Sequence, residues 1–163
     1  MKKTVCLVLL LCLSLSMFPV APASADFGEF PVEVINYADG SYMIVTIAEG
    51  PETYAPTVVG TNAVAATKSG SKTYTHYNSS GTLLWSATLT AAFSYNGSTA
   101  SCTSANCTVS ISNNAWVVIS KSCTRSGNTA TANVTMGRQA AGITIQIIPI
   151  TITLSCDANG NLS

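Results

Sequence analysis

Charged residues are scarce in this chain. Seven Lys/Arg and seven Asp/Glu make up 9% of its 163 residues, against about a quarter in an ordinary globular protein. Five scattered bases after residue 25 are too few for a nucleic-acid-binding surface, which needs clustered Lys and Arg. Serine and threonine replace charge, with 37 positions after residue 25. This composition indicates a secreted protein whose β-strands present hydroxyl groups to water, or one that uses its surface for association.

The residues that build catalytic and metal sites are equally scarce. His76 is the only histidine, so any Ser-His-Asp triad must use it. It lies in a predicted strand with no acidic residue near it in the sequence, which indicates a surface residue. Asp157 is the only acid after residue 57, so paired glycosidase carboxylates would have to come from the N-terminal segment. We therefore predict no catalytic residue, no cofactor and no metal site.

The first 25 residues have the pattern of a signal peptide. Lys2 and Lys3 precede an apolar run over 5–20, and small residues at 23–25 form a cleavage site. The run is shorter than the roughly twenty residues of a membrane-spanning helix. We expect cleavage before Asp26, export to the cell envelope or the medium, and no membrane span after processing.

Two of the six cysteines lie in the signal peptide. The other four are Cys102, Cys107, Cys123 and Cys156. An even number in an exported chain predicts two disulfides, for which three pairings are possible. A zinc site would need closely spaced cysteine pairs or histidines, which this sequence does not provide.

Residues 26–67 form an acidic segment with many turn-forming residues. Six of the seven acids lie before residue 57, and proline and glycine interrupt the segment repeatedly. We expect a loosely ordered N-terminal segment in which 42–47 could form a strand. Such a segment would either dock on the mildly basic remainder or be solvated.

From residue 68 onward, apolar and polar residues alternate with a period of two. The pattern is clearest over 83–95 and is followed by Asn96-Gly97, a hairpin signal. The last strand changes phase, which predicts a β-bulge at Ile147-Ile148 beside Pro149. No helical period occurs. Residues 68–163 are therefore predicted to form an all-β domain, an antiparallel immunoglobulin-like β-sandwich of about seven strands.

Two further patterns concern the surface. Thr-x-Thr occurs four times, at 73–75, 88–90, 129–131 and 151–153. Threonine is a good β-former on a solvent-facing sheet. We therefore interpret the repeats as ordinary strand residues and not as a flat array for binding a ligand.

Trp85 is in phase with the apolar face of its strand, which predicts a core residue. Trp116 lies beside a turn and is the better candidate for contact with a ligand such as a sugar.

Several short motifs resemble those of an uncharacterised family of small secreted all-β proteins of Gram-positive, Clostridia-type bacteria. They are Thr67-Lys68-Ser69, Leu84-Trp85-Ser86, Phe93-Ser94-Tyr95-Asn96-Gly97, Cys102-Thr103, Ser120-Lys121-Ser122, Ser126-Gly127-Asn128-Thr129-Ala130 and Thr153-Leu154-Ser155-Cys156. These motifs consist of turn and strand residues and specify no chemistry. The resemblance implies that Cys102 and Cys156 form the common disulfide and that Cys107 with Cys123 is an addition.

Together these features lead us to expect an exported, non-catalytic β-sandwich with a binding or structural role. Its expected partner is cell-wall glycan or another envelope protein. Two alternatives come from other classes of protein: a secreted, antagonistic bacteriocin-like peptide, and a hydrolase with an unrecognised site.

Overall fold

The computed structural model describes residues 30–54 and 66–163. Within these ranges the chain forms eight strands and no helix. The strands are β1 (Phe30–Asn36), β2 (Tyr42–Tyr54), β3 (Ala66–Tyr77), β4 (Leu83–Tyr95), β5 (Ala100–Ile111), β6 (Trp116–Ser126), β7 (Thr129–Ala140) and β8 (Ile143–Ser155). All pairings are antiparallel, which confirms the prediction of an all-β chain.

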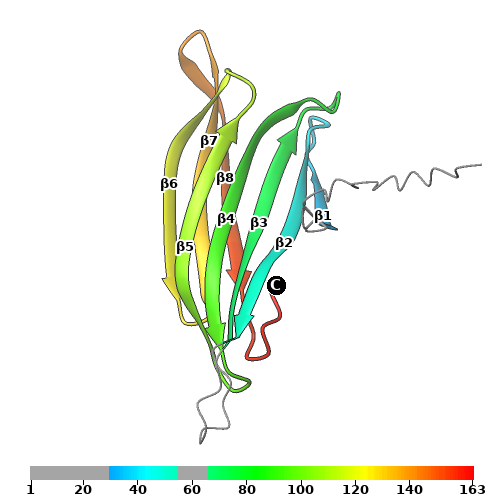
Figure 1. Cartoon of the computed structure of the whole chain (residues 1–163). Helices are drawn as coiled ribbons and strands as arrows, with labels where there is room; N and C mark the ends of the chain where they lie inside the picture. The colour runs from blue at the N-terminus through cyan, green and yellow to red at the C-terminus, as the bar shows by residue number, and fades with distance from the viewer. Residues whose placement is uncertain (1–29, 55–65) are drawn as a thin grey trace, which may run out of the picture.

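The strands form two sheets, a five-stranded sheet β1-β2-β3-β4-β5 and a three-stranded sheet β6-β7-β8 (Figure 1). Within each sheet every strand pairs with its neighbours in the sequence, and the chain passes from one sheet to the other between β5 and β6. An immunoglobulin fold interleaves its strands between the sheets through Greek-key connections. The strand order here is instead that of two successive meanders. Of the eight described strands, six (β3 to β8) correspond to the region for which we expected about seven.

The core lies between the two sheets and is built around β4. Trp85, Leu89 and Phe93 are buried on one face of this strand, as its alternation predicts. They pack with buried residues of β7 and β8, which include Met136 and Ile152. Burying large apolar side chains from both sheets is the main stabilising contribution to such a fold.

The phase change in the last strand has a different position from the one we expected. The register shifts opposite Arg138 and Gln139, which makes Ile145 the extra residue. Ile143, Ile145 and Ile147 are 68%, 58% and 60% exposed. The bulge predicted at Ile147-Ile148 is therefore wrong in position, and Ile147 is exposed because it lies on the outer face of the strand, next to the buried Ile148.

The expectation of a loosely ordered segment over 26–67 is also wrong for its described residues. β1 and β2 belong to the five-stranded sheet, and β2 pairs with β3 from Tyr42 to Tyr54. The chain accommodates Gly50-Pro51 through a register shift between Glu49 and Glu52, so turn-forming residues do not end the strand. Lys68 Nζ lies 2.7 Å from Glu49 Oε2, which ties the acidic segment to the basic one. The predicted signal peptide and its cleavage site lie outside the described residues.

None of the described residues belongs to a helix of the length and apolarity needed to cross a membrane.

Candidate functional site

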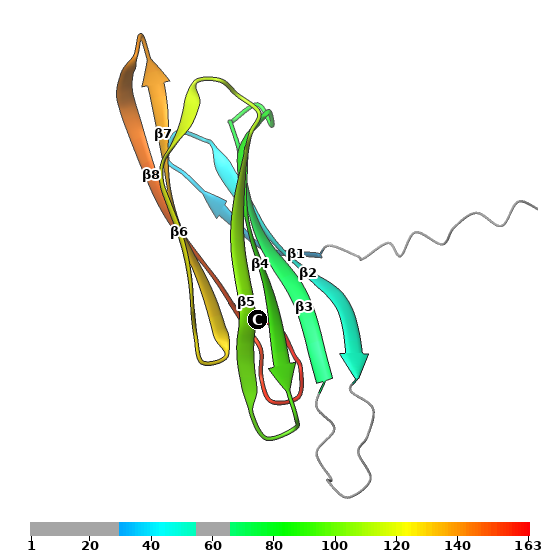
Figure 2. The same ribbon diagram turned by 60° about the vertical axis from the view of Figure 1, so that its left-hand side comes forward.

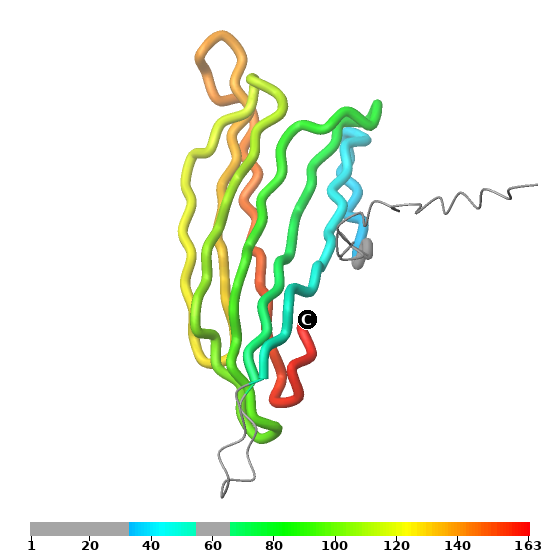
Figure 3. The backbone as a smooth tube through the Cα atoms, in the orientation of Figure 1, coloured from blue at the N-terminus to red at the C-terminus, as the bar shows by residue number. Residues whose placement is uncertain are grey.

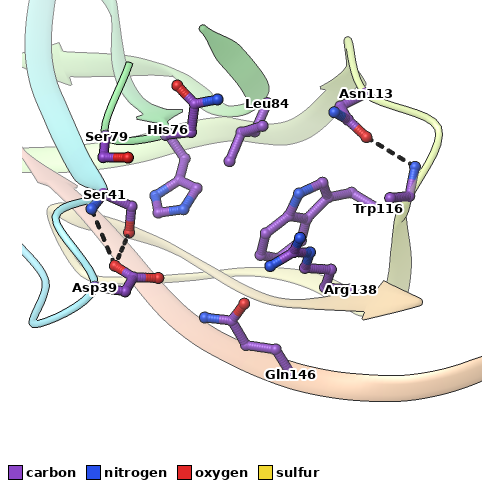
Figure 4. Close-up of a pocket in the computed structure, with 11 residues that line it drawn as sticks. Asp39, Ser41, His76, Ser79, Leu84, Asn113, Trp116, Arg138 and Gln146 are labelled. Atoms are coloured by element: carbon purple, nitrogen blue, oxygen red, sulfur yellow. Dashed lines mark hydrogen bonds between the residues drawn. The ribbon is translucent and has the colours of Figure 1, made fainter. Parts of the chain in front are cut away.

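One end of the molecule carries a pocket of about 360 Å³. Four connections close it, and each contributes side chains to the lining (Figure 4). They are the β1–β2 turn with Asp39 and Ser41, the end of β3 with His76 and Asn78, the β5–β6 turn with Asn113 and Trp116, and the β7–β8 hairpin with Arg138 and Gln146. Because the strands are antiparallel, connections that are far apart in the sequence meet at this end.

The β1–β2 turn places a carboxylate at the mouth of the pocket. Asp39 Oδ1 accepts hydrogen bonds from the Ser41 hydroxyl at 2.6 Å and from the Ser41 amide at 3.0 Å. The hydroxyl bond is the main cause that lowers the pKa of Asp39. Gly40 has a φ of +78°, a conformation that glycine adopts without strain. The turn thus presents an ionised Asp39 toward the pocket.

His76 forms the inner wall, and it is buried rather than on the surface. Only 1% of it is exposed, and its ring stacks on Trp85 at 5.0 Å with an interplanar angle of 22°. Burial lowers the pKa of His76, and the Asp39 carboxylate opposes part of this shift. Its Nδ1 is buried and has no hydrogen-bond partner within the described residues. Our expectation of a surface histidine is therefore wrong, and the fold brings Asp39, which is distant in the sequence, to the same pocket.

The burial of His76 predicts a dependence of stability on pH. The unfolded chain takes up a proton on His76 near pH 6.5, whereas the folded chain does so only at lower pH. Folding stability should therefore fall as the pH drops through about 6.5. Differential scanning fluorimetry between about pH 7.5 and about pH 5.5 should show a falling melting temperature, and His76→Phe should flatten this fall. An equally steep fall in the variant would show that another group titrates.

The pocket brings together residue types found in hydrolases, but their hydrogen bonds differ from those of a triad. A Ser-His-Asp triad joins the histidine to both the serine and the acid. In the described part of the chain, Ser41 donates to Asp39, and no hydrogen bond joins His76 to either residue. Three or more His, Cys, Asp or Glu side chains grouped for a metal ion do not occur among the described residues.

Trp116, which the sequence indicates as a candidate for ligand contact, lines the pocket. The β5–β6 turn positions it, since the Trp116 amide donates to the Asn113 carbonyl at 3.0 Å and the Asn113 side chain accepts from the Ala115 amide at 2.9 Å. Trp116 is 4% exposed and lies 6.0 Å from Trp85, which is fully buried as predicted. Trp116 thus links the pocket to the core.

Cys102, Cys107, Cys123 and Cys156 are free in the structure, which does not show the two expected disulfides. The backbone nevertheless brings the expected partners to the same places. The amides of Cys102 and Cys156 bind the carbonyls of Gly127 and Asn128, which are neighbours in the β6–β7 turn. Counting five residues along each strand from the Cys102–Gly127 bond brings Cys107 level with Ser122, the neighbour of Cys123. Cys123 contributes to raising the pKa of both Cys102 and Cys107, although burial is the larger cause for each thiol.

We predict that the protein recovered from the medium of a secreting host contains the disulfides Cys102–Cys156 and Cys107–Cys123. Closing a loop of about 55 residues with the first bond should stabilise the fold by about 4 kcal/mol in the chain-entropy account. Peptide mapping without reduction should recover both linked pairs. A linked Cys102–Cys107 or Cys102–Cys123 peptide would contradict the assignment.

The Thr-x-Thr repeats extend across the outer faces of the sheets. Thr73 faces Thr88, with their hydroxyl oxygens 3.0 Å apart. The same row continues to Thr46 in β2 and Thr108 in β5. Rows of paired threonines are common on exposed antiparallel sheets and stabilise them modestly. We assign these rows to the sheet and not to the candidate site.

Comparison with known protein families, curated proteins and solved structures finds no match to this chain. The resemblance to secreted bacterial proteins therefore remains an expectation.

Proposed function

We propose that this protein is an exported, non-catalytic β-sandwich that binds a small polar ligand, a sugar of the kind found in cell-wall glycan, in the pocket beside Trp116. The composition of the lining carries the proposal. It combines apolar walls with a carboxylate, a guanidinium, amides and hydroxyls, a combination typical of sites that orient a small ligand with a few polar contacts. The apolar walls are Leu84 and Trp116, and the polar groups include Asp39, Arg138 and Gln146.

The charges of the lining favour a neutral ligand. Asp39 and Arg138 carry opposite charges, and burial keeps His76 neutral near pH 7. Carboxylate, guanidinium and amide groups offer donors and acceptors in planar pairs that suit adjacent ring hydroxyls. A hydroxyl group of the ligand would also pair with the buried Nδ1 of His76, which otherwise lacks a partner within the described residues. The small exposed part of the Trp116 indole would border an apolar part of the ligand.

The test is a titration of the protein with mono- and disaccharide fragments of cell-wall glycan, in which isothermal titration calorimetry measures binding. Gln146→Ala removes one polar group from the lining and should weaken binding by about 5–10-fold, the usual effect of a lost hydrogen bond. Thr144→Ala is the matched control, since Thr144 is an exposed residue of the same strand outside the pocket lining. Failure of every fragment to bind, or equal weakening by both variants, would contradict the proposal.

One observation favours hydrolysis as a second candidate function. The fold brings Asp39 and His76 to one pocket together with two hydroxyl groups, those of Ser41 and Ser79. Incubation with the same fragments, analysed by mass spectrometry, distinguishes the two functions. Cleavage by the native protein that His76→Phe abolishes would establish a hydrolase, whereas binding without cleavage is the result that the first proposal predicts.

A further inference from the structure

The hairpin between β7 and β8 extends beyond the rest of its sheet. Pairing between β6 and β7 ends at Trp116 and Arg138, whereas β7 and β8 continue to pair as far as Ala140 and Ile143. The ribbon rises above the other strands at the end that carries the pocket (Figures 1 and 3), and it also projects in the turned view (Figure 2). All residues from 139 to 145 are exposed. This two-stranded tip is therefore the part of the three-stranded sheet that reaches furthest from the core.

The tip is apolar where a solvated hairpin would be polar. Ile143, Ile145 and Ile147 are each at least 58% exposed. Ile119 of β6 is 49% exposed and lies over Gly137, since a Cβ added there would sit 2.7 Å from its Cδ1. The isoleucines therefore line the tip and continue onto the sheet below it. Lower on the outer face of this sheet, the residues are mostly Ser, Thr and Asn, as in the paired row Thr124, Thr131 and Thr153.

The turn at the tip keeps this apolar character at a conformational cost. Ala141 and Gly142 have φ values of +49° and +78°, as a two-residue hairpin turn of this kind requires. Asparagine or glycine adopts such a φ more readily than alanine. Among the described residues, Ala141 is the only residue other than glycine with a positive φ. Strain retained at an exposed turn is a reason to look for a function there.

The hairpin carries one charge, and it is positive. Between Thr129 and Ser155 the only charged residue is Arg138, at the base of the tip. No acidic side chain on the hairpin would repel an anionic surface. A cation directly behind exposed apolar residues matches the order of a lipid surface, in which acyl chains lie beneath phosphate groups.

We propose that the tip of the β7–β8 hairpin docks on an anionic lipid bilayer and buries Ile143, Ile145 and Ile147 at the boundary between headgroups and acyl chains. The bilayer is favoured over a second copy of the chain by the shape and size of the patch. A stable protein interface engages about 20–30 residues on each side and needs complementary surfaces, whereas four isoleucines on a protruding ribbon are few. Lipid association needs apolar area and a compatible charge, and no complementary shape.

Docking in this way would leave the pocket close to the bilayer. Arg138 and Gln146 line the pocket and belong to the strands that support the tip. The proposal does not depend on the pocket having a ligand. The isoleucines would make the apolar contact with the bilayer, whereas Arg138 belongs both to the pocket lining and to the base of the tip.

The first test places an indole at the tip and follows its fluorescence with vesicles of phosphatidylglycerol and phosphatidylcholine. The two native tryptophans are at most 4% exposed, so an added exposed indole responds separately. Ile145→Trp should shift its emission to shorter wavelength when vesicles are added, and brominated lipid should quench it. Val34→Trp in β1, where Val34 is 54% exposed, is the matched control and should not respond. No response at position 145 would overturn the proposal.

The second test measures the partition of the protein, recovered from the medium of a secreting host, onto the same vesicles by sedimentation. Ile143→Ser, Ile145→Ser and Ile147→Ser together should reduce partition by at least about tenfold, because each loses apolar area that the bilayer would bury. Val34→Ser with Ile111→Ser removes exposed apolar side chains elsewhere and should leave partition unchanged. Equal partition of both variants would overturn the proposal. So would a lipid-independent dimer, detected by analytical ultracentrifugation, that only the triple variant dissociates.

Discussion

Trp85→Ala should destabilise the fold by about 3–5 kcal/mol, the range for truncating a large aromatic residue in a packed core. Trp85 is fully buried in β4, with the His76 ring stacked on one side and Trp116 on another. Its removal leaves a cavity between the two sheets that these rigid neighbours cannot fill. Since a domain of this size is stable by about 5–15 kcal/mol, the variant should lose a large part of its stability.

Urea unfolding followed by circular dichroism measures this loss. Leu83→Ala is the control in the same strand, because Leu83 is 37% exposed and its truncation should cost less than about 1 kcal/mol. Trp85→Phe should retain much of the stability, since the indole nitrogen of Trp85 has no hydrogen-bond partner within the described residues to lose. Similar losses in Trp85→Ala and Leu83→Ala would contradict the placement of the core.

Gly160→Ala should cost about 2–4 kcal/mol, through backbone strain and steric overlap together. Gly160 has a φ of +89°, and a Cβ there would lie 2.5 Å from Cζ of Tyr95. That contact is too short for any side chain, so the Tyr95 ring must move from its place at the end of β4. Tyr95 in turn donates a hydrogen bond to Glu52 of β2, so its displacement disturbs a second contact.

Gly97→Ala separates the two causes. Gly97 has a φ of +81°, but an added Cβ would meet nothing within 4 Å. It should therefore show only the strain of the left-handed conformation, about 1 kcal/mol. Thermal unfolding of both variants gives the comparison. Equal losses would mean that the turn after β8 does not pack against Tyr95.

The strands near the core could be predicted from the sequence because their alternation reflects burial on one face. β4 has the predicted bounds, and Trp85 is buried as its phase indicates. β1 and β2 were harder to predict because acidic and turn-forming residues interrupt them, and a register shift between Glu49 and Glu52 absorbs the interruption. Alternation also misled us over Ile143, Ile145 and Ile147. A period of two shows that residues share a face, but not whether another sheet covers that face.

The pocket could be predicted only in part. Trp116 beside a turn was a usable signal, because turns gather at the ends of a sandwich. The approach of Asp39 to His76 was not predictable from local patterns. It depends on the pairing of β2 with both β1 and β3, which brings the β1–β2 turn to the end of β3 that carries His76. Arg138 and Gln146 enter the pocket because they pair with each other level with Trp116, at the end of β6. Such contacts depend on the relative lengths and register of strands, which local patterns do not specify.

The central claim, that the pocket beside Trp116 is a ligand site, is tested most directly by nuclear magnetic resonance during a titration with cell-wall glycan fragments. The indole resonance of Trp116 and the side-chain amides of Asn113 and Gln146 should shift together and saturate at one concentration. The amides of Thr88 and Thr131, on the outer faces of the two sheets, should not move. Shifts confined to the outer faces, or no shift with any fragment, would contradict the claim.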